Sequence, residues 1–542
     1  MIKTVTTTPF KDQKPGTSGL RKKVTVFQQP HYLENYIQAT FDAIDAKGKF
    51  YVIGGDGRFF GYEAIQTIIK IAAGNDVKKL LIGQNGLFST PAVSNVIRKY
   101  KADGAIILSA SHNPGGPTGD FGVKYNIAAG GPAPEEITDK IYNKSLDIQS
   151  YKIIEADDVS LNEIGAKFNV GDMEVEIINP VTDYVEMMQE LFDFDAIKAL
   201  FASGFTIKFD GMHAITGPYA VEIIENQLGA QKGSVINAVP LKDFGGGHPD
   251  PNLVWAKELV DIMYGDNPAD MGAASDGDGD RNMILGQSFF VSPSDSLAAL
   301  VANAQYVKGY KNNLYGVARS MPTSVIVDKV AEGVGISCYE TPTGWKFFGT
   351  LLDAKKVSLC GEESFGTGSN HIREKDGLWA VLYWLNIVAI RKMSIADINK
   401  ELWAKYGRAF YMRHDFEEVS TEAADNVMNG LEDSLSSIVG KTFNGLTVTF
   451  ADNFSYTDPV DGSKAANQGY RIMFDNESRA IFRRSGTGTA GATLRLYMER
   501  MEYDTALQGQ DNPEALKEVV KAAYELSNIL ALTGKSEPDV IT

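Results

Sequence analysis

The sequence has little cysteine and no long apolar stretch. Its 542 residues include two cysteines, Cys338 and Cys360, both in strand-like apolar runs. Neither belongs to a metal-binding or redox spacing, so we expect two core thiols in a reducing cytoplasm. The longest apolar stretch, Leu378 to Ile390, is shorter than a membrane span of about 20 residues and predicts a buried helix. Met1 to Lys14 lacks the apolar core of a signal peptide.

Positive charge is also scarce. The chain carries 52 Lys and Arg against 69 Asp and Glu, a formal net charge of −17. Nucleic acid and anionic membrane surfaces are therefore poor partners, and a small anionic substrate would need a local basic pocket. Hydrophobic residues make up 44 % and charged residues 22 %, which is ordinary for globular proteins. The length predicts about three to five domains.

A strand–helix–strand order recurs three times along the chain. The first copy runs from a strand at 50–53, through a helix at 64–72 and a strand at 79–82, to a helix after Pro91 and a strand at 104–108. The second has a strand at 206–209, a helix at 217–228 and a strand at 271–274. The third has a strand at 315–318, a helix at 324–331 and strands at 336–340 and 357–360. This order predicts parallel sheets covered by helices.

The chain after about Tyr406 has a different pattern. Leu446 to Phe450 and Thr493 to Tyr497 read as strands, and Asn512 to Leu532 has helical spacing. We expect a separate α+β domain there.

Polar loops follow the last strand of each repeated unit. They are Ser109 to Pro114, Asp276 to Arg281, and Gly361 to Ser364. Ligands of open α/β sheets bind beyond the carboxyl ends of the strands. Three such loops could therefore supply different chemical groups to one site.

Three aspartates alternate with glycines at Asp276, Asp278 and Asp280. In an extended loop alternate side chains point to one side, so the carboxylates would converge and repel unless protonated or bridged by a cation. Hard oxygen ligands suit Mg²⁺. A calcium-binding EF-hand is excluded, because its sixth and twelfth positions would be Arg281 and Gln287. The alternative is a solvated acidic turn.

Ser111 is a candidate nucleophile in a loop that Pro114 keeps from becoming helical. A serine hydroxyl needs a partner or a metal to react, and a lone Ser-His pair can also be an ordinary turn. Opposite an acidic metal loop, phosphoryl chemistry is the more attractive interpretation, because a phosphoserine carries close to two negative charges.

The segment Gly486 to Gly491 matches G-x-G-x-x-G. A strand-like segment follows it, whereas the dinucleotide fingerprint must open a helix. Arg483, Ser485 and Thr487 with the glycine backbone fit an anion-binding nest better. A glycine-rich hairpin without a ligand is the alternative.

Glu362 and Ser364 can bind the hydroxyls of a sugar, or can simply close a strand-end turn. The nearby His371, Arg373 and Lys375 can be a charged surface face. We expect four further histidines to be structural or solvated. They are His31, His213, His248 and His414.

Taken in order, these motifs resemble the α-D-phosphohexomutase family, and its phosphoglucomutase branch in particular. The resemblance runs nearly end to end, and its motifs lie at residues 16–21, 111–116, 276–281, 341–345, 361–366, 371–377 and 483–488. The loop from Gly115 to Gly122 and the pair Gly344 and Trp345 are more similar to the glucose-specific branch than to the mannose or glucosamine branches.

The resemblance implies a fold of three similar mixed-sheet α/β domains and a C-terminal α+β domain around one central cleft. The expected domains are 1–187, with the phosphoserine loop; 188–300, with the metal loop; 301–405, with the sugar loop; and 406–542, with the phosphate loop. It implies an intramolecular phosphotransferase that interconverts glucose 1-phosphate and glucose 6-phosphate, with Mg²⁺ as cofactor and glucose 1,6-bisphosphate as intermediate. We expect a sugar phosphate as the partner, no nucleic acid or membrane, and a monomer or weak oligomer. The alternatives are a mutase that also accepts mannose phosphate and a non-catalytic scaffold of the same fold.

The resemblance also assigns roles to single residues. It makes Ser111 the phosphoserine and, through its phosphate, a metal contact beside Asp276, Asp278 and Asp280. The acid–base and charge-stabilising candidates are Arg21, His112, Lys124 and Lys375. The substrate-binding candidates are Arg281, Thr343, Gly344, Glu362, Ser364, Arg483, Ser485, Thr487 and Arg495. A free lysine has a pKa of about 10.4, so a lysine base would need that pKa lowered.

Two positions depart from the family pattern. Ser109 stands where a threonine is usual, and Arg484 stands beside Arg483 where an apolar residue is common. Neither change removes a catalytic group, but Arg484 could alter the affinity for phosphate.

Overall fold

The computed structural model describes residues 1–16, 18–488 and 491–542, the side chains of 486–488 excepted. The chain divides into two compact units. The first comprises residues 1–293, 303–314 and 344–396, and the second comprises residues 294–302, 315–343 and 397–542.

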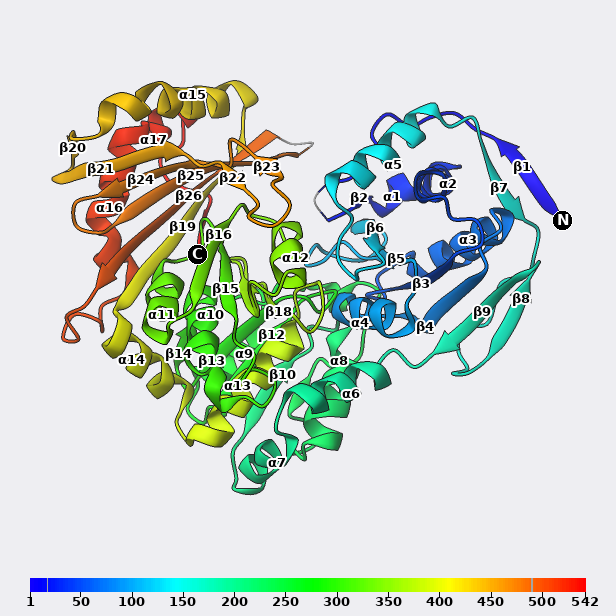
Figure 1. Ribbon diagram of the computed structural model, residues 1–542, viewed down its shortest axis with the longest axis horizontal. Helices are drawn as coiled ribbons and strands as arrows, with labels where there is room; N and C mark the ends of the chain where they lie inside the picture. Colours follow the sequence, from blue (N-terminus) through cyan, green and yellow to red (C-terminus); the bar gives the residue numbers. More distant parts are fainter. Residues whose placement is uncertain (17, 489–490) are drawn as a thin grey trace. The chain divides into compact units, whose positions relative to one another are not determined.

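The first unit begins with a mixed seven-stranded sheet in the order β2-β6-β5-β3-β4-β9-β8 (Figure 1). Its strands are β2 (Leu20–Lys23), β3 (Phe50–Gly55), β4 (Lys79–Leu87), β5 (Gly104–Leu108), β6 (Asp120–Ile127), β8 (Lys167–Val170) and β9 (Met173–Ile178). Its helices are α1 (Val24–Phe27), α2 (Tyr32–Ile44), α3 (Gly61–Gly74), α4 (Thr90–Tyr100) and α5 (Glu135–Asp147). The central strands β5, β3, β4 and β9 are parallel, as the strand–helix alternation predicts. A separate ribbon pairs β1 (Ile2–Thr6) with β7 (Ser150–Ile154).

The two faces of this sheet are covered by different helices. Tyr51 and Ile53 pack in one apolar cluster with residues of α2 and α3, such as Ile37 and Ile68. Val52, which points to the opposite face, lies outside that cluster, and α4 packs against β3 and β5. Helix α4 starts at Ser89, whose hydroxyl accepts a hydrogen bond from the Ala92 N–H at 3.3 Å. The loop after β5 therefore emerges from a sheet that is buried on both faces.

A five-stranded sheet follows, in the order β11-β10-β12-β13-β14. Its strands are β10 (Ile207–Asp210), β11 (Val235–Ile236), β12 (Met271–Ser275), β13 (Asn282–Gly286) and β14 (Phe289–Val291). Around it lie α6 (Thr182–Leu191), α7 (Phe194–Ala202), α8 (Thr216–Ala220), the π-helix η1 (Val221–Gln227), η2 (Phe244–Gly246) and α9 (Lys257–Met263). Strand β12 runs parallel to β10 and then turns back into β13, so the aspartate loop lies at a hairpin.

The first unit also contains the segment that follows residue 343. It holds α12 (Lys346–Asp353), the antiparallel pair β17 (Leu359–Gly361) and β18 (Thr367–Ser369), and α13 (Gly377–Arg391). Helix α13 contacts η3 (Ala304–Tyr306), which comes from the separate stretch 303–314 of the same unit. Every residue of α13 from Gly377 to Ala389 is buried. This confirms the buried helix predicted from the apolar stretch.

The second unit is built on a seven-stranded antiparallel sheet, in the order β20-β21-β24-β25-β26-β19-β27. Its strands are β19 (Arg408–Val419), β20 (Thr442–Phe443), β21 (Leu446–Asn453), β24 (Tyr470–Phe474), β25 (Arg479–Gly488), β26 (Gly491–Glu502) and β27 (Val540–Ile541). Helices α15 (Thr421–Ile438), α16 (Asn512–Ser527) and α17 (Ile529–Thr533) share one apolar cluster with it (Figure 1). The small ribbon β22 (Tyr456–Thr457) and β23 (Lys464–Ala465) completes this α+β part.

The remainder of the second unit precedes that sheet in the chain. It holds α10 (Pro293–Ala302), the parallel strands β15 (Gly316–Ser320) and β16 (Ser337–Thr341), α11 (Ile326–Val334) and most of α14 (Ile395–Tyr406).

The predicted elements are present, with corrections at a few boundaries. The helix expected at 217–228 begins as α8 and continues as the π-helix η1. Arg319, expected after its strand, lies inside β15. Of the two thiols expected in the core, Cys360 is buried, but Cys338 is only half-buried. The four domain ranges and the common cleft stay predictions.

No single helix of the described chain is long and apolar enough to cross a membrane. Helices α13 and α14 pass a test of length and composition only as a pair, and they are bent by 84° at the break between them.

Candidate metal and phosphoryl-transfer site

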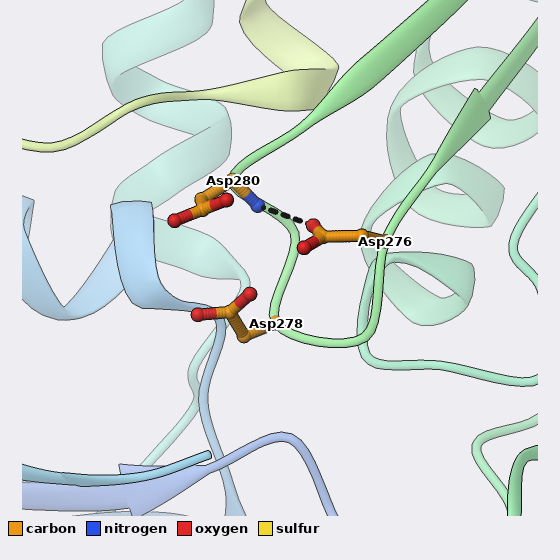
Figure 2. A group of neighbouring side chains, drawn as sticks. All are labelled: Asp276, Asp278 and Asp280. Atoms are coloured by element: carbon orange, nitrogen blue, oxygen red, sulfur yellow. Dashed lines mark hydrogen bonds between the residues drawn. The ribbon is translucent and has the colours of Figure 1, made fainter. Parts of the chain in front are cut away.

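The aspartate loop is a tight turn between β12 and β13. Gly279 adopts a φ of +83°, a conformation that favours glycine. The backbone N–H groups of Asp280 and Arg281 donate to Oδ1 of Asp276 at 2.9 and 3.0 Å, and Figure 2 shows the first of these bonds. The expected convergence of the carboxylates is therefore present, but the expected extended loop is wrong. The turn, and not strand alternation, brings the three side chains together.

The three carboxylates lie close together at the turn (Figure 2). Each offers an oxygen within 4.8 Å of the others, and all three side chains are buried. Oδ2 of Asp278 accepts a hydrogen bond of 2.6 Å from the Thr90 hydroxyl, but its buried Oδ1 has no hydrogen-bond partner among the described residues. An unpaired buried carboxylate oxygen is costly. This donor set fits a hard divalent cation.

Burial and mutual repulsion shift the pKa values of the triad. Burial, followed by the charges of its two neighbours, raises the pKa of Asp276 well above its usual range. Burial and then Asp278 also raise the pKa of Asp280. The pKa of Asp278 is lowered: burial alone would raise it, but the Thr90 hydrogen bond and nearby positive charges, Lys124 first, outweigh burial. A cation between them would relieve this repulsion.

Ser111 lies directly against this triad. Its hydroxyl donates a hydrogen bond of 3.0 Å to Oδ2 of Asp276, and Nδ1 of His112 lies 3.3 Å from the same hydroxyl oxygen. The Ser111 N–H donates to the Ser109 hydroxyl oxygen at 2.7 Å. Serine at position 109 therefore retains the hydroxyl that the more usual threonine would supply. The structure brings the predicted nucleophile and the predicted metal loop together.

His112 lies beside the Ser111 hydroxyl, and positively charged side chains lie near His112. Burial, followed by the positive charges of Arg281, Arg21 and Lys375, lowers the pKa of His112 well below its usual range, so its ring is neutral at pH 7. Burial lowers the pKa of Arg21. The Nε atoms of Arg21 and Arg281 are buried without a hydrogen-bond partner among the described residues. Unpaired guanidinium donors suit an anionic ligand such as a phosphate.

The two predicted lysines have different partners. Lys124 forms a buried ion pair with Glu374, which also accepts a 2.8 Å hydrogen bond from Asn126. Nζ of Lys375 lies 3.0 Å from Oδ1 of Asp280. The pKa of Lys375 is raised, because Asp280 and other carboxylates outweigh the opposing effect of burial. The lowered pKa that a lysine base would need is therefore not found at Lys375, which fits a fixed positive charge.

The predicted sugar loop lies far from the metal loop in the chain but contacts it in space. The Asn282 N–H at the start of β13 donates to the Phe365 carbonyl at 2.9 Å. Oε1 of Glu362 accepts a 2.8 Å hydrogen bond from the Gly344 N–H, and burial raises the pKa of Glu362. Ser364 is half-buried in the same loop. The Thr343 hydroxyl is buried without a partner among the described residues, but Thr343 belongs to the second unit.

The predicted phosphate nest is part of the second unit. Arg483 and Arg495 are opposite each other on β25 and β26, so their side chains share a face. Nε of Arg483 donates to the Gln468 carbonyl at 3.1 Å, and Nε of Arg495 lies 3.6 Å from Oδ2 of Asp415. Ser485 lies on the same strand and is half-buried. The side chain of Thr487 lies outside the described residues, as do residues 489–490 and Thr17 of the first motif.

The Arg484 side chain contacts a neighbouring helix on the other face of β25. It forms an ion pair with Asp425 of α15. Alternate residues of a strand point to opposite faces, so Arg484 points away from the face of Arg483 and Arg495. The suggestion that Arg484 alters phosphate affinity is therefore not supported by its position.

Several residues near the site were missed or misjudged from the sequence. Asp56 and Arg58 at the end of β3 contact the serine loop, and Glu374 pairs with Lys124. The first two follow a parallel strand, which is the position where ligand sites of such sheets lie. The charged surface face proposed for His371, Arg373 and Lys375 is wrong. The His371 side chain is 2 % exposed and lies 3.0 Å from Asp376, and Arg373 is buried beside Asp353. His248, considered structural or solvated, has its ring centre 6.1 Å from that of His112.

Sequence models of one protein family match nearly the whole chain. The first three are described as phosphoglucomutase/phosphomannomutase α/β/α domains I, II and III, and match residues 12–152, 182–288 and 293–406. The fourth, phosphoglucomutase-1 C-terminal domain, matches residues 408–539. The fold of three α/β domains and a distinct C-terminal domain is thereby confirmed.

Individual relatives agree with these matches. The chain is 60 % identical to a phosphoglucomutase of Rhizobium radiobacter over 543 residues, covering 100 % of both sequences. It is 54 % identical to the chloroplastic phosphoglucomutase 1 of Marchantia polymorpha, covering 100 % of this chain and 85 % of that one. The crystal structure of parafusin, a phosphoglucomutase of Paramecium in its open form, superposes with a TM-score of 0.93 at 46 % identity, covering 100 % of this chain and 99 % of that one. The chain therefore belongs to the phosphoglucomutase/phosphomannomutase family of enzymes.

Proposed function

We propose that this enzyme is a phosphoglucomutase, which interconverts α-D-glucose 1-phosphate and glucose 6-phosphate through a phosphorylated Ser111. The observation that carries the proposal is the 3.0 Å hydrogen bond between the Ser111 hydroxyl and Asp276 of a buried carboxylate triad. Relatives named phosphoglucomutase match the chain over its full length, which supports glucose phosphates as substrates.

Asp276, Asp278 and Asp280 would hold a Mg²⁺ ion, together with a phosphate oxygen on Ser111. The unpaired Oδ1 of Asp278 and the mutual distance of at most 4.8 Å support this assignment. When bound, the ion would neutralise charge on the transferring phosphoryl group. The remaining steps depend on the residues of the chain itself.

In the first half-reaction a hydroxyl of the sugar attacks the phosphorus of phosphorylated Ser111. The bond between phosphorus and Oγ of Ser111 breaks as a bond to the sugar oxygen forms. The proton of the sugar hydroxyl passes to a base and from the base to Oγ of Ser111, which leaves as a hydroxyl. His112 is neutral and lies 3.3 Å from Oγ, so it is a candidate for that base, and Lys124 is the second. Lys375, with its raised pKa, would stabilise negative charge as a cation. The product is glucose 1,6-bisphosphate.

In the second half-reaction the bisphosphate has turned round and returns its other phosphoryl group to Ser111. Because the bisphosphate binds in two orientations, the groups that hold it must accept either end of the sugar. Glu362 and Ser364 would accept sugar hydroxyls, with Gly344 and Thr343 shaping that loop. Arg483, Ser485, Thr487 and Arg495 would hold the phosphate that is not transferred. Such positioning can lower the barrier by roughly 7–11 kcal/mol.

The test is turnover on three substrates by the purified enzyme with Mg²⁺. We expect glucose 1-phosphate to be converted faster than mannose 1-phosphate or glucosamine 1-phosphate. Equal turnover of mannose phosphate would replace the proposal with a broader phosphohexomutase. Turnover of none of the three would leave a non-catalytic scaffold and contradict the proposal.

The location and assembly state belong to the same proposal. Two free thiols, Cys338 and Cys360, fit a reducing compartment, which we propose to be the cytoplasm. Several relatives are named chloroplastic, so subcellular fractionation decides between these locations. We propose a monomer or weak oligomer, which sedimentation at several protein concentrations tests.

A further inference from the structure

Ser111 has an unusual backbone conformation for its residue type. Its φ is +53°, in the left-handed region that residues with a Cβ atom rarely adopt. Such a conformation persists only when the surrounding structure enforces it. The backbone of the proposed nucleophile therefore needs a restraint, and the contacts of its N–H and carbonyl groups show what supplies it.

The carbonyl group of Ser111 is held by a buried arginine. Nη2 of Arg58 donates to the Ser111 carbonyl at 2.7 Å, and Nη1 donates to the Asp120 carbonyl at 2.8 Å and the Asn113 carbonyl at 3.4 Å. The Arg58 side chain is 1 % exposed. One planar guanidinium group therefore ties together the two ends of the serine loop, because its donors point in fixed directions.

The N–H group of Ser111 is held by the partner of that arginine. Nε of Arg58 donates to Oδ1 and Oδ2 of Asp56 at 3.0 and 2.9 Å. Oδ2 of Asp56 accepts a 2.6 Å bond from the Ser109 hydroxyl, whose oxygen accepts the Ser111 N–H at 2.7 Å. The N–H and carbonyl groups of Ser111 are thus both connected by hydrogen bonds to the buried ion pair of Asp56 and Arg58.

Neighbouring residues leave this assembly little room to move. The ring of Phe244, itself buried, lies 5.2 Å from the Arg58 guanidinium carbon. The Lys242 carbonyl accepts the N–H groups of Phe59 at 2.8 Å and Gly116 at 3.2 Å. A Cβ atom at Gly277 would lie 2.3 Å from the Ser111 carbonyl oxygen, so only glycine fits there. The serine loop is therefore packed between the arginine and the metal loop.

We propose that Arg58, braced by Asp56, is a positioning residue that locks the Ser111 backbone and so aims its Oγ at the carboxylate triad. Arg58 acts through Ser111, since its donors are engaged with Asp56 and with loop carbonyls. This inference rests on the proposed function of Ser111. It also gives a structural reason why Ser111 keeps a strained backbone conformation: Arg58 and Asp56 hold it in place.

The test compares Arg58→Lys with the wild-type enzyme. Lysine keeps the charge but lacks the planar fork that holds several acceptors at once. We expect kcat for glucose 1-phosphate to fall about 10²-fold, with KM unchanged, because misplacement of a reacting group by about 1 Å costs that much. Single-turnover transfer from the phosphorylated enzyme to glucose 6-phosphate should slow by the same factor.

The control is Gln66→Ala in the same domain. Gln66 is buried and also clamps a loop, because its amide donates to the Val159 carbonyl at 2.8 Å and accepts the Val159 N–H at 2.9 Å. This variant should lose stability without losing kcat per folded molecule. A loss in Arg58→Lys that merely follows the folded fraction, as in the control, would overturn the proposal.

A second pair of variants covers the case in which Arg58→Lys does not fold. Ser109→Ala removes the hydroxyl between Asp56 and the Ser111 N–H, and Ser109→Thr restores it. We expect Ser109→Ala to lower kcat and not KM, and Ser109→Thr to recover kcat. Equal kcat in the two variants would contradict the positioning role. If the wild-type enzyme itself shows no mutase turnover, the proposed function fails instead.

Discussion

The hydroxyl of Ser111 donates a hydrogen bond of 3.0 Å to Oδ2 of Asp276, from which it is separated by 165 positions in the sequence. The first residue follows β5 of one mixed sheet, and the second follows β12 of another. The ends of β5 and β12, which belong to different sheets, therefore bring the oxygens of Ser111 and Asp276 into contact. A phosphoryl group on Oγ would lie next to three buried carboxylates, which is tolerable only with a cation between them.

Replacement of Ser111 by alanine should abolish mutase turnover and leave the protein folded. The alanine lacks the oxygen that would carry the phosphoryl group, but it fits the space of the serine. Turnover of glucose 1-phosphate and the melting temperature should be measured together. Ser145→Ala is the control, because Ser145 is also buried and its hydroxyl donates to the nearby Tyr142 carbonyl at 2.7 Å, far from the triad in the sequence. Normal turnover in Ser111→Ala would contradict the nucleophile assignment.

Replacement of Asp278 by asparagine should remove the stabilisation of the protein by Mg²⁺. Ligand binding stabilises the native state by about 2.7 kcal/mol at 100 times Kd. Without metal the variant should be less stable than the wild type, because the lowered pKa of Asp278 means that the folded protein favours its charged form. Melting temperatures with EDTA and with added Mg²⁺ measure both effects.

The control for that experiment is Asp210→Asn. Asp210 is a buried carboxylate outside the triad, and its Oδ1 accepts hydrogen bonds from the Met212 N–H at 2.8 Å and from Asn237 at 3.0 Å. This variant should keep the rise in melting temperature with Mg²⁺. If Asp278→Asn keeps the same rise, the triad is not the metal site.

Replacement of Arg483 by alanine should weaken substrate binding, whereas replacement of its neighbour Arg484 should not. A hydrogen bond to a charged group contributes about 1.5–3 kcal/mol, so we expect KM for glucose 1-phosphate to rise roughly 10- to 100-fold in Arg483→Ala. Arg484 forms a partly exposed ion pair with Asp425, and such pairs contribute about 0–1 kcal/mol to stability. Steady-state kinetics of both variants distinguish the two faces of β25. An equal rise in KM in both would refute the proposed nest.

Acid should destabilise the protein in part through His414. Burial lowers the pKa of His414 to about 4, whereas an unfolded histidine has a pKa of about 6.5. Between these values the unfolded chain binds the proton and the folded chain does not, so stability is lost as the pH falls below about 6.5. Melting temperatures at pH 8 and pH 5 should therefore differ less in His414→Gln than in the wild type.

The comparison at pH 8 serves as the internal control for His414, because the ring is neutral there in both states. Any difference between variant and wild type at pH 8 reports lost packing and the lost bond of 2.7 Å to the Tyr524 hydroxyl. An equal decrease from pH 8 to pH 5 in both proteins would exclude His414 as a contributor.

Elements with a strong pattern could be predicted from the sequence. The strand Gly104–Leu108 lies where the apolar run predicts it, and the helix Gly377–Arg391 is buried as its apolar length indicates. The convergence of the aspartates was also predictable from their spacing. Its geometry was not, because the φ of +83° at Gly279 and the two backbone donors to Asp276 depend on the turn.

Contacts between distant segments could not be predicted. Arg58 follows a glycine-rich turn like many surface arginines, and only the fold places its guanidinium on the Ser111 carbonyl. The raised pKa of Lys375 depends on Asp280, which lies in a different loop. The change from α-helix to π-helix at Val221–Gln227 could not be predicted either, because the sequence there has no periodic pattern that distinguishes the two.

The most direct test of the central claim is the intact mass of the purified wild-type enzyme before and after incubation with glucose 6-phosphate. We predict a fraction heavier by one phosphoryl group, located at Ser111 by fragmentation, which disappears as glucose 1,6-bisphosphate is formed. An enzyme that turns over glucose 1-phosphate while its mass shows no phosphoryl group on Ser111 at any stage would contradict the account.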